Sequence, residues 1–290
     1  MSHRPVRKAI FPVAGLGTRL LPATKTMPKE MLTIVDRPLI QYAVDEAREA
    51  GIEEMILVTG RGKSSLVDYF DTSFELEAVM EKAGKSLEPL ALARARPGEI
   101  VSVRQQQPLG LGHAVWCARH IVGDEPFAVL LPDDLMIGKP GALKQMMDAY
   151  EELGGNIICA QEVPADRTGS YGIVTPGATK GATTEVKGLV EKPSPEHAPS
   201  RLGVVGRYIL QPEVMEILGK GEKGAGGEIQ LTDGMAGLIG TQPFHALAVD
   251  AVRHDCGDRA GFVLANLAIA MDRDDLRPRI ENYLAGLRRG

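Results

Sequence analysis

Short buried runs and amphipathic segments alternate along the first half of the chain. Runs of apolar and β-branched residues predict buried strands, and the apolar spacing between the runs predicts helices. The expected strands are 9–13, 55–59, 100–104, 127–131 and 156–163, and the expected helices are 38–50, 112–120 and 142–153. Strands that alternate with helices in this order form βαβ units, so we expect a parallel sheet.

Two parts of the chain depart from this alternation. Residues 62–96 are charged and favour helix, with apolar residues at helical spacing, which indicates an inserted helical segment with a packing or subunit-contact role. From Thr168 onward, short extended runs are separated by glycine and proline turns, a pattern typical of short strands. These runs are 171–175, 184–190, 203–210 and 244–252, and helices are expected at 212–219, from 226 and after 258.

Together the elements predict an α/β, Rossmann-like fold with a mixed, mainly parallel sheet flanked by helices and a smaller β-rich part. The chain of 290 residues, 44% of them hydrophobic, is long enough for one large core. We therefore expect a single domain over residues 1–290, with a first half at about 1–165, a second half at about 166–257 and C-terminal helices at 258–290.

Charge and composition exclude several classes of partner. The net charge is −5 and aromatic residues make up 4% of the chain, so a surface for nucleic acid is not expected. The three cysteines, Cys117, Cys159 and Cys256, are widely spaced, which favours buried thiols in a reducing cytoplasm over disulfides or a zinc site. No apolar stretch approaches the ~18 residues of a membrane span, and we expect no membrane contact.

The run from Lys8 to Met31 carries the strongest chemical signal. After the first predicted strand the chain turns at Gly15 and Gly17, which permit positive φ and a close approach to a ligand. Successive backbone N–H groups in such a turn form a concave anion site. Three cations and two prolines follow, which indicates a stiff loop for a polyphosphate: Arg19, Lys25, Lys29, Pro22 and Pro28.

Two better-known glycine motifs do not match. The dinucleotide fingerprint requires a third glycine where this chain has Leu20. The P-loop requires a glycine ahead of Gly62-Lys63-Ser64, and Leu57 stands there.

Further polar residues follow predicted strands and should meet the glycine loop at the carboxyl edge of the sheet. A carboxylate at the end of a buried strand is costly unless it is paired or binds a metal, and Mg²⁺ on a nucleotide takes only one or two protein carboxylates. Asp133 and Asp255 are the candidates, and spacing alone does not exclude Asp134. Gln105 and Gly110 suit a base, since an amide edge can donate and accept, although Gln106 or Gln107 could replace Gln105.

The Lys8–Met31 run resembles the signature of sugar nucleotidyltransferases, Gly-x-Gly-Thr-Arg-x-x-Pro followed by Pro-Lys. Its Ala-Thr-Lys at 23–25 and Glu-Met-Leu at 30–32 resemble the bacterial UTP–glucose-1-phosphate uridylyltransferases within that family. The resemblance extends over almost the whole chain and includes the Gly-Gly-Glu-Ile-Gln run at 226–230, which we take as a feature of the fold.

The resemblance implies a nucleotidyltransferase fold and a Mg²⁺-dependent reaction. UTP and glucose 1-phosphate would give UDP-glucose and pyrophosphate, with the second half of the chain binding the sugar. The implied catalytic residues are Arg19, Lys29 and Lys192, and the implied metal ligands are Asp133 and Asp255. The implied nucleotide-binding residues are Ala14, Gly15, Gly17, Thr18, Gln105 and Gly110, and the implied sugar-binding residues are Tyr171, Gly172, Glu191 and Val204.

Two alternatives remain at this point. A glucose-1-phosphate thymidylyltransferase differs from the implied enzyme only in contacts to one base methyl and one ribose hydroxyl. A catalytically silent nucleotide-sugar binding protein would be expected to lack one of the charged residues, yet all five are present: Arg19, Lys29, Asp133, Lys192 and Asp255. The resemblance further implies a homo-oligomer, a dimer or a tetramer, with the insert and the C-terminal helices as candidate contacts.

Overall fold

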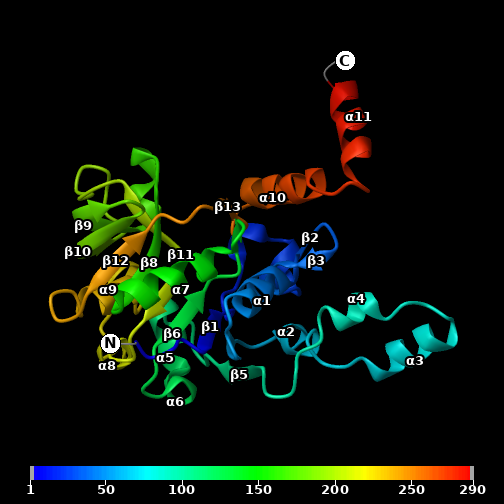
Figure 1. Ribbon diagram of the computed structural model, residues 1–290, viewed down its shortest axis with the longest axis horizontal. Coiled ribbons are helices and arrows are strands. Elements are labelled where there is room, and N and C mark those ends of the chain that lie inside the picture. The colour runs from blue at the N-terminus through cyan, green and yellow to red at the C-terminus, as the bar shows by residue number, and fades with distance from the viewer. Residues whose placement is uncertain (1–2, 288–290) are drawn as a thin grey trace.

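The centre of the protein is a nine-stranded mixed sheet, shown by the computed structural model, which describes residues 3–287 (Figure 1). The strand order is β5-β4-β1-β6-β11-β8-β12-β10-β9. The strands are β1 (Lys8–Pro12), β4 (Glu54–Thr59), β5 (Ile100–Arg104), β6 (Phe127–Leu130), β8 (Asn156–Glu162), β9 (Gly172–Lys180), β10 (Thr183–Glu191), β11 (Leu202–Leu210) and β12 (Phe244–Leu247).

The predicted parallel arrangement is confirmed in one part of this sheet. Strands β5, β4, β1 and β6 are all parallel neighbours. The next strand of this sheet along the chain, β8, does not join them, because β11 lies antiparallel between β6 and β8. Every residue of β11 after the first is buried, as a central strand requires. The β-rich second half therefore continues the same sheet instead of forming a separate one.

Helices cover both faces of the sheet and divide the core into two clusters. Side chains of β1 alternate between them: Ala9 and Phe11 face the cluster under α1 (Leu39–Glu49) and α7 (Ala142–Leu153), and Ile10 faces the other. That second cluster lies under α5 (Leu111–Cys117), α8 (Val214–Gly219) and α9 (Leu231–Ala236).

Several element boundaries differ from those predicted. The helix predicted at 112–120 starts at Leu111 and stops at Cys117, and α6 (Arg119–Val122) follows. Pro38 lies just before α1, and not in its first turn, because it pairs with Thr33 across the small sheet of β2 (Thr33–Ile34) and β3 (Arg37–Pro38). Strand β7 (Asp134–Ile137) was not predicted; it pairs antiparallel with β13 (Val252–Asp255).

The insert is helical, as predicted, but most of it does not pack on the sheet. Helix α2 (Ser65–Asp68) lies at its base, and the arm (residues 71–92) contains α3 (Phe74–Lys82) and α4 (Glu88–Ala91). No residue of α3 or α4 is buried, and Figure 1 shows the arm extending away from the sheet. The arm therefore makes few contacts with the body, and the packing or subunit-contact role expected for the insert stays a prediction.

Of the C-terminal helices, α10 (Arg259–Met271) packs one face against β2 and β13, and α11 (Arg277–Leu287) projects from the body (Figure 1). The last residues of the predicted C-terminal helices, 288–290, lie outside the described part of the chain. Among residues 3–287 there is no helix with both the length and the apolar character that crossing a bilayer requires.

Candidate active site

The glycine loop leaves β1 as predicted, but only one of its two glycines needs special backbone geometry. Gly17 has φ +67°, and a Cβ there would lie 3.1 Å from the Thr24 side chain. Thr24 fixes the turn, since its Oγ1 donates to the Gly17 carbonyl oxygen at 2.7 Å. Gly15 has no positive φ, and a Cβ there would make only an ordinary contact, 3.9 Å from Cε of Lys29. Three short 3₁₀ helices follow, at Thr18–Leu20, Ala23–Lys25 and Lys29–Met31, so the prolines do prevent a regular helix.

A cavity of about 360 Å³ lies between this loop and the start of α5. All six predicted nucleotide-binding residues line it: Ala14, Gly15, Gly17, Thr18, Gln105 and Gly110. Gln105 is buried and donates from Nε2 to the Gly110 carbonyl oxygen at 3.0 Å. The alternatives Gln106 and Gln107 line a different cavity, on the other side of the strand end.

Packing alone requires glycine at position 110, whether or not a ligand is bound. Its φ is +113°, and a Cβ would lie 2.6 Å from the Ile229 carbonyl oxygen and 2.8 Å from Cβ of Glu228. The loop therefore docks against residues 228–229, which brings a second-half segment to the nucleotide cavity.

A second cavity of about 690 Å³ adjoins the first, and the two share Leu111 and Glu228 in their walls. It is lined by catalytic, metal and sugar residues of the predicted set: Arg19, Asp133, Tyr171, Gly172, Glu191, Lys192, Val204 and Asp255. Lys29 is the one predicted residue that lines neither cavity of the described chain.

The two predicted metal ligands meet at Gly257. A Cβ on Gly257 would lie 3.0 Å from Oδ2 of Asp133 and 3.0 Å from Oδ1 of Asp255, and 3.8 Å from Nη1 of Arg19. The backbone holds this arrangement, because the Cys256 amide donates to the Asp133 carbonyl oxygen at 2.7 Å. Only glycine at position 257 leaves room between the two carboxylates.

Lys29 contacts Asp133 of this group without lining either cavity. Its Nζ lies 2.5 Å from Oδ2 of Asp133. Burial disfavours both charges, but their mutual attraction outweighs it, so the pKa of Asp133 is below and the pKa of Lys29 above the ordinary value. One residue further, Glu30 is fully buried and accepts from Nζ of Lys63 at 2.8 Å.

Asp134 points away from this group. Its Oδ2 accepts from the Gly206 amide at 2.9 Å, and its Oδ1 accepts from Nε of Arg253 at 2.7 Å. Burial raises the pKa of Asp134 despite this cation. Both oxygens are engaged within the fold, in contrast to Asp133.

The sugar end of the larger cavity depends on an unusual backbone at Lys192. This residue has φ +49°, a left-handed conformation that is rare outside glycine. Its amide donates to the Tyr171 carbonyl oxygen at 2.9 Å. The chain thus departs from strand alternation here, and Glu191 and Lys192 line the same cavity, with Oε1 and Nζ 3.3 Å apart.

Two residues of this site, Arg253 and Glu228, were not predicted from the sequence. Arg253 lines the larger cavity and donates to Tyr171 Oη at 3.2 Å; its position two residues before Asp255 on a strand was the available signal. Glu228 lines both cavities, although its motif was read only as a feature of the fold.

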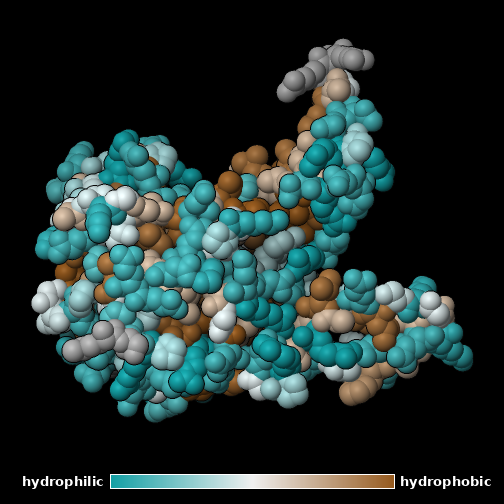
Figure 2. All heavy atoms as spheres, viewed as in Figure 1, coloured by the Kyte–Doolittle hydropathy of each residue, from teal (hydrophilic) through white to brown (hydrophobic). Residues whose placement is uncertain are grey.

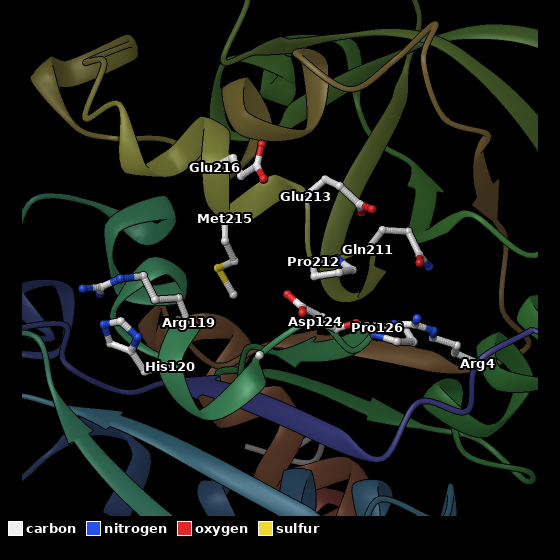
Figure 3. Close-up of a pocket in the computed structure, with 11 residues that line it drawn as sticks. Arg4, Arg119, His120, Asp124, Pro126, Gln211, Pro212, Glu213, Met215 and Glu216 are labelled. Carbon is white, nitrogen blue, oxygen red and sulfur yellow. Dashed lines mark hydrogen bonds between the residues drawn. The ribbon is translucent and has the colours of Figure 1, made fainter.

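Another cavity, of about 640 Å³, opens at the opposite end of the strands and contains none of the predicted residues (Figure 3). Side chains of both charge signs surround it, among them Arg4, Asp124 and Glu213. Figure 3 shows Arg119 and His120 on one side and Pro212, Glu213 and Met215 on the other. This mixture indicates no particular ligand.

A glycine loop, a cluster of cations and two carboxylates meeting at the carboxyl edge of an α/β sheet are the features of a protein that binds a nucleotide through its phosphates. A sequence profile of the nucleotidyl transferase family matches residues 8–270. The UTP–glucose-1-phosphate uridylyltransferase of Komagataeibacter xylinus is 52% identical over 283 residues, covering 97% of each chain.

Solved structures agree with this assignment. A UDP-glucose pyrophosphorylase complexed with UDP-glucose matches with a TM-score of 0.85 and 44% identity, over 92% of this chain and 100% of that one. A UTP-bound pyrophosphorylase of the same kind from Acinetobacter baumannii matches with a TM-score of 0.86 and 42% identity, over 97% of this chain and 99% of that one. The chain therefore belongs to the nucleotidyl transferase family and, within it, to the UTP–glucose-1-phosphate uridylyltransferases. This confirms the resemblance and the fold class predicted from the sequence.

Proposed function

We propose that this nucleotidyltransferase transfers a uridylyl group from UTP to glucose 1-phosphate, giving UDP-glucose and pyrophosphate. The observation that carries the residue assignment is the meeting of Arg19, Asp133 and Asp255 around Gly257, at the wall of the larger cavity. It places a cation and two carboxylates beside the cavity that contains Lys192 and next to the cavity that contains Gln105.

The chemistry needs little besides positioning and neutralisation of charge. An oxygen of the sugar phosphate attacks the α-phosphorus of UTP, and pyrophosphate leaves in line with it. The nucleophile is already an anion, so no strong general base is required. Lys192 orients the sugar phosphate, Arg19 stabilises the triphosphate and the departing pyrophosphate, and Lys29 supports them through Asp133.

The same residues fit a divalent cation. Asp133 and Asp255 lie on either side of Gly257 and both line the larger cavity, and one or two protein carboxylates are what Mg²⁺ takes beside a nucleotide. Among residues 3–287 no cluster of three or more such ligands exists, so phosphate oxygens and water would complete the shell. We assign Mg²⁺ to the larger cavity beside these two carboxylates, where it would neutralise the reacting phosphates.

The neighbouring halves of the site have separate tasks in this proposal. The first half of the chain binds the nucleotide through Ala14, Gly15, Gly17, Thr18, Gln105 and Gly110. The second half binds glucose through Tyr171, Gly172, Glu191 and Val204. The cytoplasmic location stays a prediction, in keeping with three cysteines that are all free thiols.

The decisive test is pyrophosphate release with Mg²⁺, in which UTP, dTTP, CTP, ATP and GTP are each combined with glucose 1-phosphate, galactose 1-phosphate or N-acetylglucosamine 1-phosphate. We expect the maximum at UTP with glucose 1-phosphate. A maximum at dTTP would assign the thymidylyltransferase reaction instead. Folded protein that binds UTP but releases no pyrophosphate in any combination would be the silent binding protein.

A further inference from the structure

His113 lies beside the base-reading residue of the proposed site and has no role in the reaction described above. It stands in the first turn of α5, and its Nδ1 is 3.0 Å from Nε2 of Gln105. The same amide nitrogen donates to the Gly110 carbonyl oxygen at 3.0 Å. Both protons of the Gln105 amide are therefore engaged.

These two contacts determine which way the amide faces. A backbone carbonyl oxygen can only accept, so the nitrogen of Gln105, and not its oxygen, must lie against Gly110. Nδ1 of His113 must then accept the second proton, which requires a neutral ring protonated at Nε2.

The surroundings of the ring favour this state. Burial lowers the pKa of His113 below its ordinary value; a hydrogen bond with the Gln107 backbone opposes this shift, and the Arg119 guanidinium adds to it. Sγ of Cys117 lies 3.9 Å from Nε2 and can accept its proton weakly. Trp116 stacks on the ring, with centroids 6.0 Å apart and planes 26° apart, and this limits its rotation.

Two groups are left for a ligand in the smaller cavity. Within residues 3–287 neither Oε1 of Gln105 nor the amide of Gly110 has a hydrogen-bond partner, and both residues line the cavity. An acceptor and a donor offered together match N3–H and a neighbouring carbonyl oxygen of uracil. Cytosine presents a lone pair at N3 and an amino group at C4, so both contacts would be mismatched.

We propose that His113 is a positioning residue that sets pyrimidine specificity: it holds the Gln105 amide so that its oxygen faces the base, and the site takes a uridine nucleotide and rejects a cytidine nucleotide. The inference rests on the proposed function for the nature of the ligand. It does not depend on which sugar phosphate reacts.

The test compares His113→Phe with His113→Gln. Phenylalanine keeps the stack on Trp116 but cannot accept a proton, whereas the amide oxygen of glutamine can. With glucose 1-phosphate as acceptor, we expect the ratio of kcat/KM for UTP to that for CTP to fall by about tenfold in the phenylalanine variant. Most of the change should lie in the KM for UTP, and the glutamine variant should recover the ratio. His120→Phe, an exposed histidine of α6, is the matched control and should leave the ratio unchanged.

An unchanged ratio in folded His113→Phe overturns the inference, and so does a fall in kcat with no change in the KM for UTP. If the phenylalanine variant does not fold, ¹⁵N NMR of the ring in the wild-type protein decides. A proton on Nε2 at pH 7.5 is the expected result, and a proton on Nδ1 overturns the inference.

Calorimetric binding of UTP and CTP separates this inference from the proposed function. If UTP is preferred, the preference falls in His113→Phe and no pyrophosphate is released, then the transfer reaction fails and the role of His113 stands. If transfer occurs and the preference is the same in both proteins, the role of His113 fails and the transfer reaction stands.

Discussion

At the scale of single residues, the adjacent carboxylates Asp133 and Asp134 have different environments and should have different functions. Asp133 faces Asp255 and Arg19 around Gly257, whereas Asp134 is engaged by Arg253 and the Gly206 amide. Their spacing in the sequence could not separate the two residues. The difference arises because Asp134 starts β7 and its side chain is buried within the fold.

Asp133→Asn should therefore lower kcat by roughly a hundredfold or more while the fold is retained. The amide keeps the shape of the side chain but removes the negative charge that would hold Mg²⁺ beside the reacting phosphates. Pyrophosphate release measures the effect, and circular dichroism checks the fold. Near-normal turnover in this variant would refute the metal assignment.

Asp134→Asn is the matched comparison and should show the opposite result. It leaves the Arg253 guanidinium buried without its carboxylate, which should lower the free energy of unfolding by about 3 kcal/mol. Urea unfolding measures the change. If Asp134→Asn instead abolished turnover in a protein of unchanged stability, the assignments of the two carboxylates would have to be exchanged.

Lys192→Ala tests the sugar end. The ammonium should contact the phosphate of glucose 1-phosphate and not the triphosphate, so the KM for glucose 1-phosphate should rise roughly 10- to 100-fold with a smaller change in the KM for UTP. Lys187→Ala is the control: this exposed lysine lies in β10, the strand that ends just before Lys192, and pairs with Glu185. A larger effect on UTP would mean that the two phosphate sites are exchanged.

At the scale of secondary structure elements, Glu99 joins the sheet to α1 at the point where the insert ends. It is almost fully buried and accepts from Nε and Nη2 of Arg48 at 3.0 and 2.9 Å, and from the Arg96 amide at 2.8 Å. The hydrogen bonds from Arg48 hold the pKa of Glu99 at about 2.

The pKa of Glu99 is lower in the folded state than the ~4.3 of a glutamate in the unfolded chain. The ionised carboxylate therefore contributes its full stabilisation above about pH 4.3, and this stabilisation is lost as the pH falls toward 2. Glu99→Gln should lower the free energy of unfolding by about 2 kcal/mol at pH 7, and the difference from wild type should shrink between pH 4.5 and 2. Urea titrations over this range measure it, with Glu185→Gln, from an exposed pair, as the control. A difference that does not vary with pH would contradict the charge-based explanation.

The elements also show what the sequence could predict. Helix α7 was predicted with its observed bounds, Ala142–Leu153, because Pro140 and Gly141 precede a regular apolar spacing and Gly154 ends it. Strand β7 was missed because its pairing partner, β13, is more than a hundred residues away in the chain, and non-local pairing leaves no local signal. The position of β11 between β6 and β8 was missed for the same reason.

The same limit applies to the site. Gln105 and Gly110 could be found because they lie on one loop, five positions apart. Glu228 reaches the nucleotide cavity only because a Gly110 without Cβ allows residues 228–229 to approach, and that contact is a property of the folded chain. His113 likewise gains a role only from its distance to Gln105.

At the scale of the whole molecule, two parts of the surface carry exposed apolar side chains: the arm and the outer face of α10. On the arm, Phe74 is 79% and Val79 65% exposed; on α10, Val263 is 63% and Leu264 57% exposed. Figure 2 shows hydrophobic side chains gathered along α10 and on the arm. Exposed apolar patches of this kind are typical of surfaces covered by a partner, and we propose that the partner is a second copy of this chain.

Two separate surfaces allow two different twofold contacts, and a protein that uses both closes into a tetramer, whereas one contact gives a dimer. We therefore predict that the wild-type protein is a tetramer. The double variant Phe74→Asp/Val79→Asp and the double variant Val263→Asp/Leu264→Asp should each be a dimer. The variant with all four changes should be a monomer. Light scattering after size-exclusion chromatography measures the mass, and Glu81→Ala, an exposed change on α3, is the control. If only one pair of changes lowers the mass, the other surface is not a subunit contact; a wild-type monomer would rule out both.

Because the proposed catalytic residues come from one chain, pyrophosphate release per chain should survive separation of the subunits, so oligomer size and turnover can be measured independently.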